Sequence, residues 1–232
     1  MADFKTTCWT LVMTTTHGTD AAQQAALERL CQDYWPPVYS YIRRRGQGEE
    51  VSKDLTQEFF ARLLEKRWLD GADPELGKFR AYLLTMLKRF LAGSYEHDTR
   101  HKRGGGALHF RLDWDSIPEI ADTADTPEEA FDRRWALTVV HRAMARVHKE
   151  AEASGRLILF AALSPFVLTE PEPGAYEQVA AELHLSRSAI AMAVHRLRLR
   201  LRELVRSEIA ETLVNHSAVE TEMQELMAAL RK

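Results

Sequence analysis

Apolar residues recur three and four positions apart along most of the chain, which is the spacing of residues on one face of a helix. In the N-terminal half this pattern predicts three helices. The first contains Pro36 and Pro37, which should break or kink it because proline lacks a backbone N–H. The second starts at Ser52, a suitable N-cap residue, and the third runs from about Gly77 to His101.

Helix ends are easier to place in the C-terminal half. Thr126 and Pro127 suit an N-cap and a first helical position, so a helix should run from there to Ser154-Gly155. Another helix is expected over residues 156–166. Apolar and polar residues do not alternate convincingly anywhere, and the short stretch 107–114 comes nearest to a strand. The sequence therefore predicts an all-α fold.

Composition shifts divide the predicted helices into two small helical modules, residues 27–106 and 127–206. Residues 107–126 between them are acidic and have few apolar anchors, as expected of a linker. Residues 1–26 form an N-terminal extension. The tail, residues 207–232, has the apolar spacing of an amphipathic helix, which should pack on the body of the protein; binding a regulator or covering a DNA-binding face are the alternatives.

The composition is that of a globular protein, with 45% hydrophobic and 28% charged residues. No apolar run approaches the length of a membrane-spanning helix, and the first residues lack the pattern of a secretory signal. The two cysteines, Cys8 and Cys31, have no metal-binding spacing. We therefore expect a cytoplasmic protein without a membrane partner.

A net charge of −3 conceals a strong segregation of charge along the chain. Residues 78–111 contain eight basic residues and two acids, whereas residues 112–132 contain eight acids and no base. Residues 186–206 contain six arginines and one acid. Because a polyanion responds to local rather than net charge, the two basic segments are candidate nucleic-acid surfaces.

Residues 176–202 have the pattern of a helix-turn-helix, a common DNA-binding unit. A short helix leads to a turn at His184-Leu185, and Ser186 caps a longer second helix. His184 should adopt a left-handed conformation, and Leu185 should fill the gap between the helices. The candidate DNA contacts are the polar and basic residues of the cap and second helix: Ser186, Arg187, Ser188, His195, Arg196, Arg198 and Arg200.

The segment Asp54-Leu55-Thr56-Gln57-Glu58-Phe59-Phe60-Ala61-Arg62-Leu63-Leu64 resembles the core of region 2 in bacterial sigma-70-type factors. Residues 77–91 look like the next helix of that family, and residues 176–204 look like its region 4. Two such blocks in this order, joined by a variable linker, are similar to the small group 4, or extracytoplasmic function (ECF), sigma factors. The modules would then be a sigma region 2-like bundle and a sigma region 4-like helix-turn-helix.

This resemblance implies a promoter-specificity subunit that binds core RNA polymerase, recognises promoter DNA and assists duplex opening. It assigns contact with the polymerase β′ clamp to Asp54, Gln57, Glu58 and Phe59. Cations and rings suited to melted DNA follow on the next helix: Lys78, Arg80, Tyr82, Lys88, Arg89, Tyr95, Arg100, Lys102 and Arg103. Further implied partners are the β flap and an anti-sigma or other regulator.

Two other classes of function stay open at this stage: a free-standing helix-turn-helix regulator, and a helical adaptor whose arginines meet an acidic protein. Catalytic chemistry finds no support. His97 and His101 lie four residues apart, yet no third metal ligand has suitable spacing, and no serine or cysteine has the surroundings of a nucleophile. The sequence therefore predicts a non-enzymatic protein with no cofactor and no metal.

Overall fold

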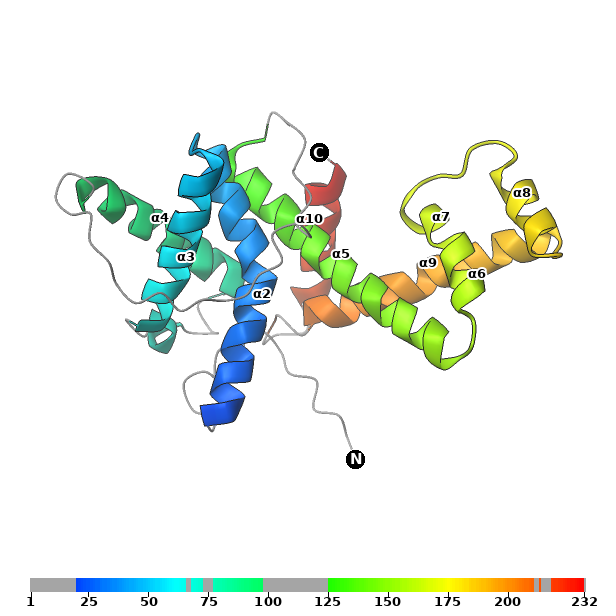
Figure 1. Ribbon diagram of the computed structural model, residues 1–232, viewed down its shortest axis with the longest axis horizontal. Coiled ribbons are helices and arrows are strands. Elements are labelled where there is room, and N and C mark those ends of the chain that lie inside the picture. The colour runs from blue at the N-terminus through cyan, green and yellow to red at the C-terminus, as the bar shows by residue number, and fades with distance from the viewer. Residues whose placement is uncertain are drawn as a thin grey trace. The chain divides into compact units, whose positions relative to one another are not determined.

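The computed structural model describes residues 20–65, 68–72, 77–97, 125–210, 213 and 218–231. Within these ranges the regular structure is helical and no strand occurs, so the predicted all-α fold is confirmed. The chain divides into two compact units (Figure 1). The first unit comprises residues 1–138 and 209–232, and the second comprises residues 139–208.

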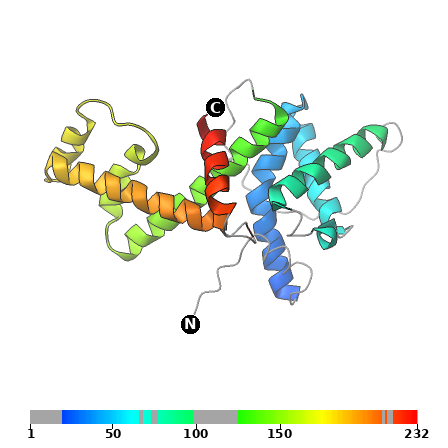
Figure 2. The ribbon, with the colours of Figure 1, turned by 180° about the vertical axis from the view of Figure 1, so that it is seen from behind.

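Three helices form the centre of the first unit: α2 (Asp20–Arg44), α3 (Glu49–Glu65) and α4 (Phe79–His97). Helix α4 crosses α2 and α3, as Figure 2 shows from behind. Aromatic rings make these contacts, because their large apolar area and edge-to-face geometry stabilise a core. Tyr34 of α2 meets Phe79 of α4 at 5.2 Å between ring centroids, and Phe59 of α3 meets Phe90 of α4 at 5.6 Å.

Pro36-Pro37 was expected to break or kink the helix, and the break does not occur, because α2 continues through both residues. Each proline removes one backbone hydrogen bond, but the surrounding side chains belong to the core. Tyr34, Trp35 and Val38 are all buried, and the Trp35 ring stacks on Phe60 at 5.1 Å. Tertiary packing therefore keeps this segment helical against its local preference.

The predicted start of the second helix is also wrong. Helix α3 begins at Glu49, three residues before Ser52. The Ser52 side chain is buried inside the helix and donates a 2.8 Å hydrogen bond to the carbonyl of Gly48. Glu49 and Glu50 occupy the first turn instead, where acidic side chains favour the positive end of the helix dipole.

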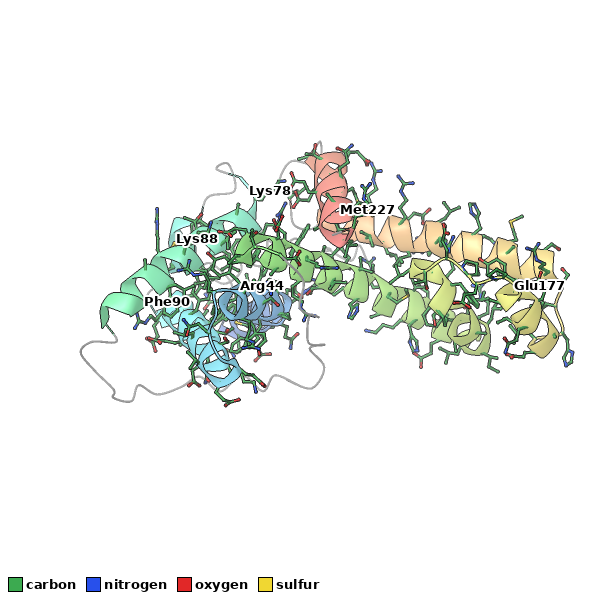
Figure 3. All side chains as sticks on the ribbon, turned by 90° about the horizontal axis from the view of Figure 1, so that it is seen from above. Arg44, Lys78, Lys88, Phe90, Glu177 and Met227 are labelled. Carbon is green, nitrogen blue, oxygen red and sulfur yellow. The ribbon has the colours of Figure 1, made fainter. Side chains whose placement is uncertain are left out.

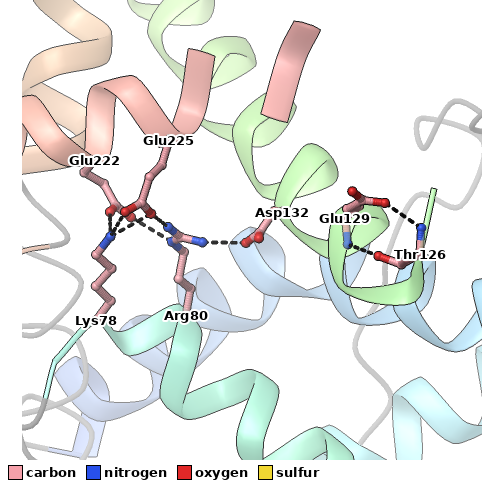
Figure 4. Close-up of polar contacts among 7 residues, drawn as sticks. All are labelled: Lys78, Arg80, Thr126, Glu129, Asp132, Glu222 and Glu225. Atoms are coloured by element: carbon pink, nitrogen blue, oxygen red, sulfur yellow. Dashed lines mark hydrogen bonds and ion pairs between the residues drawn. The ribbon is translucent and has the colours of Figure 1, made fainter. Parts of the chain in front are cut away.

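The predicted helix start at Thr126-Pro127 is confirmed, as helix α5 spans Pro127–Ala153. Thr126 accepts a hydrogen bond from the Glu129 backbone N–H at 3.2 Å, and the Glu129 carboxylate accepts one from the Thr126 N–H at 2.8 Å (Figure 4). This reciprocal pair is a capping box. At the other end Gly155 has φ +67°, as expected of a residue that ends a helix.

The start of α5 belongs to the first unit, whereas the sequence placed residues 127–206 in one module. Side chains of α5 contact both neighbouring helices in this unit. Arg134 donates to the Ser40 hydroxyl of α2, and Lys88 of α4 pairs with Glu128 at 2.7 Å. These contacts fix the first three turns of α5 on the bundle, a feature that sequence spacing alone does not reveal.

The tail forms the predicted amphipathic helix, α10 (Val219–Arg231), and it belongs to the first unit. Val219 and Leu226 are buried, and so is the carboxylate of Glu222. Figure 3 shows Lys78 extending from the start of α4 toward this helix. The prediction that the tail packs on the body of the protein is therefore confirmed.

The second unit contains α6 (Leu157–Leu163), α7 (Pro165–Leu168), α8 (Ala175–Glu182) and most of α9 (Arg187–Ala210). One core cluster joins α6, α8 and α9 through five buried side chains: Leu163, Val179, Ala180, Ile190 and Val194. The single helix expected over residues 156–166 is instead two short helices. They separate at Ser164-Pro165, because the proline cannot donate the next helical hydrogen bond.

A tight turn joins α8 to α9. His184 has φ +54°, which confirms its predicted left-handed conformation, and the Leu185 N–H bonds to the Ala180 carbonyl at 2.9 Å. Ser186 caps α9 as predicted, because its hydroxyl accepts from the Ala189 N–H at 3.2 Å. Leu185 does not fill the gap between the helices. It is 45% exposed, and Leu183 packs on the core instead.

None of the helices in the described ranges is both long enough and apolar enough to span a membrane.

Candidate functional sites

Helix α3 presents a polar face formed by Asp54, Gln57 and Glu58. These positions are three and four residues apart, so their side chains lie on one side of the helix. Asp54 is exposed, whereas Gln57 and Glu58 are half-buried. Glu58 pairs with Arg62 at 2.5 Å, and Arg62 lies over the Phe90 ring at 5.3 Å. The result is a compact acidic and amide surface supported by the aromatic core beneath it.

Phe59 does not belong to that surface. Its side chain has no exposed area and contacts Phe60, Trp68 and Phe90. The expectation that Phe59 takes part in direct docking is therefore corrected, because a buried ring cannot contact a partner without unfolding the helix. Phe59 contributes instead to the core that holds the polar face in place.

Two of the predicted DNA-contacting cations, Lys78 and Arg80, meet carboxylates within the first unit (Figure 4). The Arg80 Nε donates to Glu222 at 2.7 Å, and its other nitrogens pair with Asp132 of α5, at 2.5 Å, and with Glu225. Lys78 pairs with Glu225 at 2.7 Å and with Glu222. Arg80 is only 12% exposed, and its guanidinium lies 4.6 Å from the centre of the Trp135 ring.

Burial and charge act in opposite directions in this network. Burial favours neutral Arg80, yet its hydrogen bond to Glu222 and the surrounding carboxylates raise the arginine pKa above its usual value, so it stays charged. Burial also raises the pKa of Asp132, and nearby Arg80 only partly offsets this. Glu225 shows the reverse balance, because Lys78 and Arg80 hold its pKa below the usual range despite its partial burial.

The remaining predicted contacts on α4 have varied surroundings. The Tyr82 hydroxyl donates to the carbonyl of Trp68 in the short 3-10 helix η1 (Trp68–Gly71), so Tyr82 has a structural partner. Lys88 is about half exposed despite its pair with Glu128, and Arg89 is exposed. The Tyr95 side chain and the residues Arg100, Lys102 and Arg103 lie outside the described part of the chain, as does His101 of the pair considered for a metal.

In the second unit the start of α9 is accessible. Ser186 and Ser188 are exposed, and Arg187 is 67% exposed while pairing with Glu177 of α8 at 2.5 Å. Figure 3 labels Glu177 on this part of the unit. One turn further along, Met192 is 57% exposed, and His195 and Arg196 are exposed too. Met192 was not among the predicted contact residues, because it lies in an apolar run between Ala189 and Val194.

Two other predicted DNA contacts on α9 hold the second unit together. Both Nε and Nη2 of Arg198 donate to the Phe166 carbonyl, at 3.1 and 2.7 Å, and Nη2 also donates to the Thr169 carbonyl at 3.0 Å. Arg198 thereby satisfies carbonyls at the end of α7. Arg200 makes two hydrogen bonds to Glu150, at 2.9 and 2.6 Å, and pairs with Glu203 at 2.8 Å.

Comparison with protein families gives a match to sigma-70 region 2 over residues 30–95. These residues include most of α2 and the whole of α3, with its polar face, and the basic start of α4. Residues 30–95, which are similar to sigma-70 region 2, are called the region 2 domain below. Curated proteins and solved structures give no significant match.

The region 2 domain supports membership of the sigma-70 family and a role in transcription initiation, with core RNA polymerase and promoter DNA as partners. Within the domain, the polar face of α3 and the cations of α4 are candidate surfaces for such partners. Among the described residues, no cluster of histidine, cysteine or carboxylate side chains is arranged to hold a metal.

Proposed function

We propose that this protein is a promoter-specificity subunit of RNA polymerase, of the ECF type, with one DNA-contacting surface in each unit. The observation that carries the proposal is the region 2 domain at residues 30–95, followed by a second helical unit in which α8, a tight turn and α9 enclose one core. The domain match favours this function over a free-standing regulator, because region 2 acts as part of a polymerase subunit.

The α3 surface is the proposed contact with the β′ clamp. Asp54, Gln57 and Glu58 offer two carboxylates and an amide on a helix whose aromatic core restricts its movement. Preorganised polar groups of this kind lose little conformational entropy on binding, which favours specific docking. The acidic character also suits a basic partner surface and should accelerate association.

The exposed start of α9 is the proposed reading surface for promoter DNA. Arg187, Ser188, His195 and Arg196 supply hydrogen-bond donors, and Met192 supplies an apolar group suited to a thymine methyl in the major groove. Ser186 keeps its proposed contact at the helix start, where backbone N–H groups favour phosphate. Arg198 and Arg200 are not assigned direct DNA contacts in this proposal. Arg198 already donates to the carbonyls of Phe166 and Thr169, and Arg200 donates to Glu150.

The test has two parts. The purified chain is mixed with core polymerase, the complex is isolated by size exclusion, and RNA 5′ ends made from genomic DNA fragments are sequenced. We expect a stable complex and start sites that core polymerase alone does not produce. Absence of a complex and of new start sites would reject the proposal, and duplex binding without polymerase would favour the free-standing regulator.

Variants of α3 make the first part specific. Asp54→Asn with Glu58→Gln should weaken binding to core polymerase about tenfold or more, since each change removes one negative charge from the proposed contact. Glu49→Gln is the matched control, because Glu49 is an exposed acid of the same helix on a different face. Equal affinity for all three proteins would show that polymerase docks elsewhere.

A further inference from the structure

Helix α10 covers part of the region 2 domain, and its contacts have two components. Val219 and Leu226 are buried, which anchors the helix through apolar area. Glu222, 1% exposed, and Glu225 meet the two cations at the start of α4, Lys78 and Arg80. Figure 4 shows both glutamates pointing from α10 toward these side chains.

These two cations are suited to a nucleic-acid backbone. Arg80 offers a planar donor group beside the ring of Trp135, which is buried while α10 is docked. A cation next to an aromatic ring is typical of sites for single-stranded nucleic acid. Lys78 is partly exposed next to it. While α10 is docked, the carboxylates of Glu222 and Glu225 occupy the donors that phosphate oxygens would otherwise use.

Charge in the cluster favours exchange of one anion for another. Two cations face three carboxylates, Glu222, Glu225 and Asp132, so one negative charge is in excess. Removing α10 would take away two of these carboxylates and leave Asp132 as the partner of Arg80. Lys78 and Arg80 would then have donors available for another anion, such as a phosphate.

A cavity of about 210 Å³ lies beside the network. Its lining includes two arginines, Arg80 and Arg133, and four carboxylates, Asp125, Glu129, Asp132 and Glu225. Because the acids outnumber the bases, the docked state disfavours entry of a phosphate, and nucleic acid would reach Arg80 only after Glu222 and Glu225 have moved away.

We propose that α10 and the phosphate backbone of single-stranded DNA bind the same surface of the region 2 domain, formed by Lys78, Arg80 and Trp135, and exclude one another. The tail is therefore a competitor built into the chain: it occupies the surface until nucleic acid displaces it. This inference rests on the proposed DNA-binding function of the domain.

The test uses the full chain carrying Glu222→Gln and Glu225→Gln, alone and bound to core polymerase, with a fluorescein-labelled single-stranded DNA of mixed sequence. We expect about tenfold tighter DNA binding than wild type, and a steeper salt dependence by about two released counterions, since two cations become available. Glu220→Gln is the control, because it removes one charge from an exposed position of the same helix and should leave affinity unchanged.

A synthetic peptide of residues 218–231 supplies the second arm. Added to the double variant, the wild-type peptide should return DNA affinity toward the wild-type value, whereas a peptide with glutamine at both positions should not. If the double variant does not fold, Glu225→Gln alone, at a partly exposed position, should give a smaller gain in the same direction.

The outcomes separate the two proposals. Equal DNA affinity of wild type and variants, with DNA bound by all, overturns competition by α10 and leaves the promoter function in place. No binding of DNA by any of them, with or without core polymerase, rejects the proposed function itself. A third outcome is that the variant binds DNA more tightly without any reversal by the wild-type peptide. In that case the higher affinity comes from loss of repulsion between the two glutamates and DNA, and the proposal that α10 and DNA bind the same surface is overturned.

Discussion

The basic residues of the two units differ in burial and in their partners. In the first unit Arg80 is nearly buried and surrounded by carboxylates from α5 and α10. In the second unit Arg187 and Arg196 are exposed, while Arg198 satisfies backbone carbonyls and Arg200 pairs with acids near the surface. A row of basic residues in a sequence can therefore form a buried ion-pair network, contacts that stabilise the fold, or an accessible binding surface. Only the neighbours of each side chain distinguish these cases.

The largest effect should come from removing the buried cation. Arg80→Ala leaves the Glu222 carboxylate buried with Lys78 as its remaining partner, so we expect about 3 kcal/mol less stability in the first unit. All five tryptophans lie in residues 1–138, so fluorescence during urea unfolding reports this unit. Arg89→Ala, at an exposed position of the same helix, should change stability by less than about 0.5 kcal/mol. Equal effects would mean that the network contributes no stability.

A smaller effect on stability should distinguish a residue that stabilises the second unit from one that binds DNA. Arg198→Ala removes three hydrogen bonds to carbonyls and should destabilise this unit by about 1.5 kcal/mol. Arg196→Ala should leave stability unchanged and weaken duplex binding instead, since its side chain is exposed. Hydrogen exchange of α7 and α9 amides measures the first effect, and a salt titration of DNA affinity measures the second. Loss of DNA binding without loss of protection in the Arg198 variant would reverse its assignment.

The smallest effect concerns pH, and Glu150 of the second unit and Asp132 of the first unit should contribute to stability with opposite signs. The hydrogen bond from Arg200 lowers the pKa of Glu150 below its ordinary 4.5. Its stabilisation is therefore present above pH 4.5 and is lost as pH falls through the lowered pKa. Burial raises the pKa of Asp132 above its ordinary 3.8, so its contribution is favourable below that pH and is lost as pH rises through the raised pKa.

Carboxyl NMR titration of the full chain measures both values directly. Arg200→Gln should return the Glu150 pKa toward 4.5 and cost about 0.5 kcal/mol near neutral pH, because the pair is exposed. The same change should leave the Asp132 titration where it was. A Glu150 pKa that does not move would show that the pair seen between Arg200 and Glu150 does not persist in solution.

Sequence patterns predicted the local structure correctly where the hydrogen bonds form within one short segment. The Thr126 cap, the Gly155 helix end, the left-handed His184 and the Ser186 cap were all predictable, because each depends on backbone groups within a few residues. The residues of the region 2 motif were recognisable for a similar reason. Their order on one helix does not depend on what packs around it.

Sequence patterns failed to predict features that depend on contacts between segments far apart in the chain. Pro36-Pro37 stays helical because Trp35 and Val38 are buried, and Phe59 is inaccessible because α4 and η1 cover it. Sequence predicted the acidic amphipathic tail, but the ion pairs of Glu222 and Glu225 with Lys78 and Arg80 span more than 140 positions. Spacing along the chain carries no information about such pairs.

The sequence by itself thus determined the helical class, several helix ends and the region 2 motif, since these follow from periodicity and short-range hydrogen bonding. Tertiary structure alone decided which cations are accessible, because burial and pairing depend on helices that meet only after folding. Because of these surroundings Arg196 is a candidate DNA contact, Arg198 stabilises the second unit, and Arg80 lies at the centre of a surface that α10 already occupies.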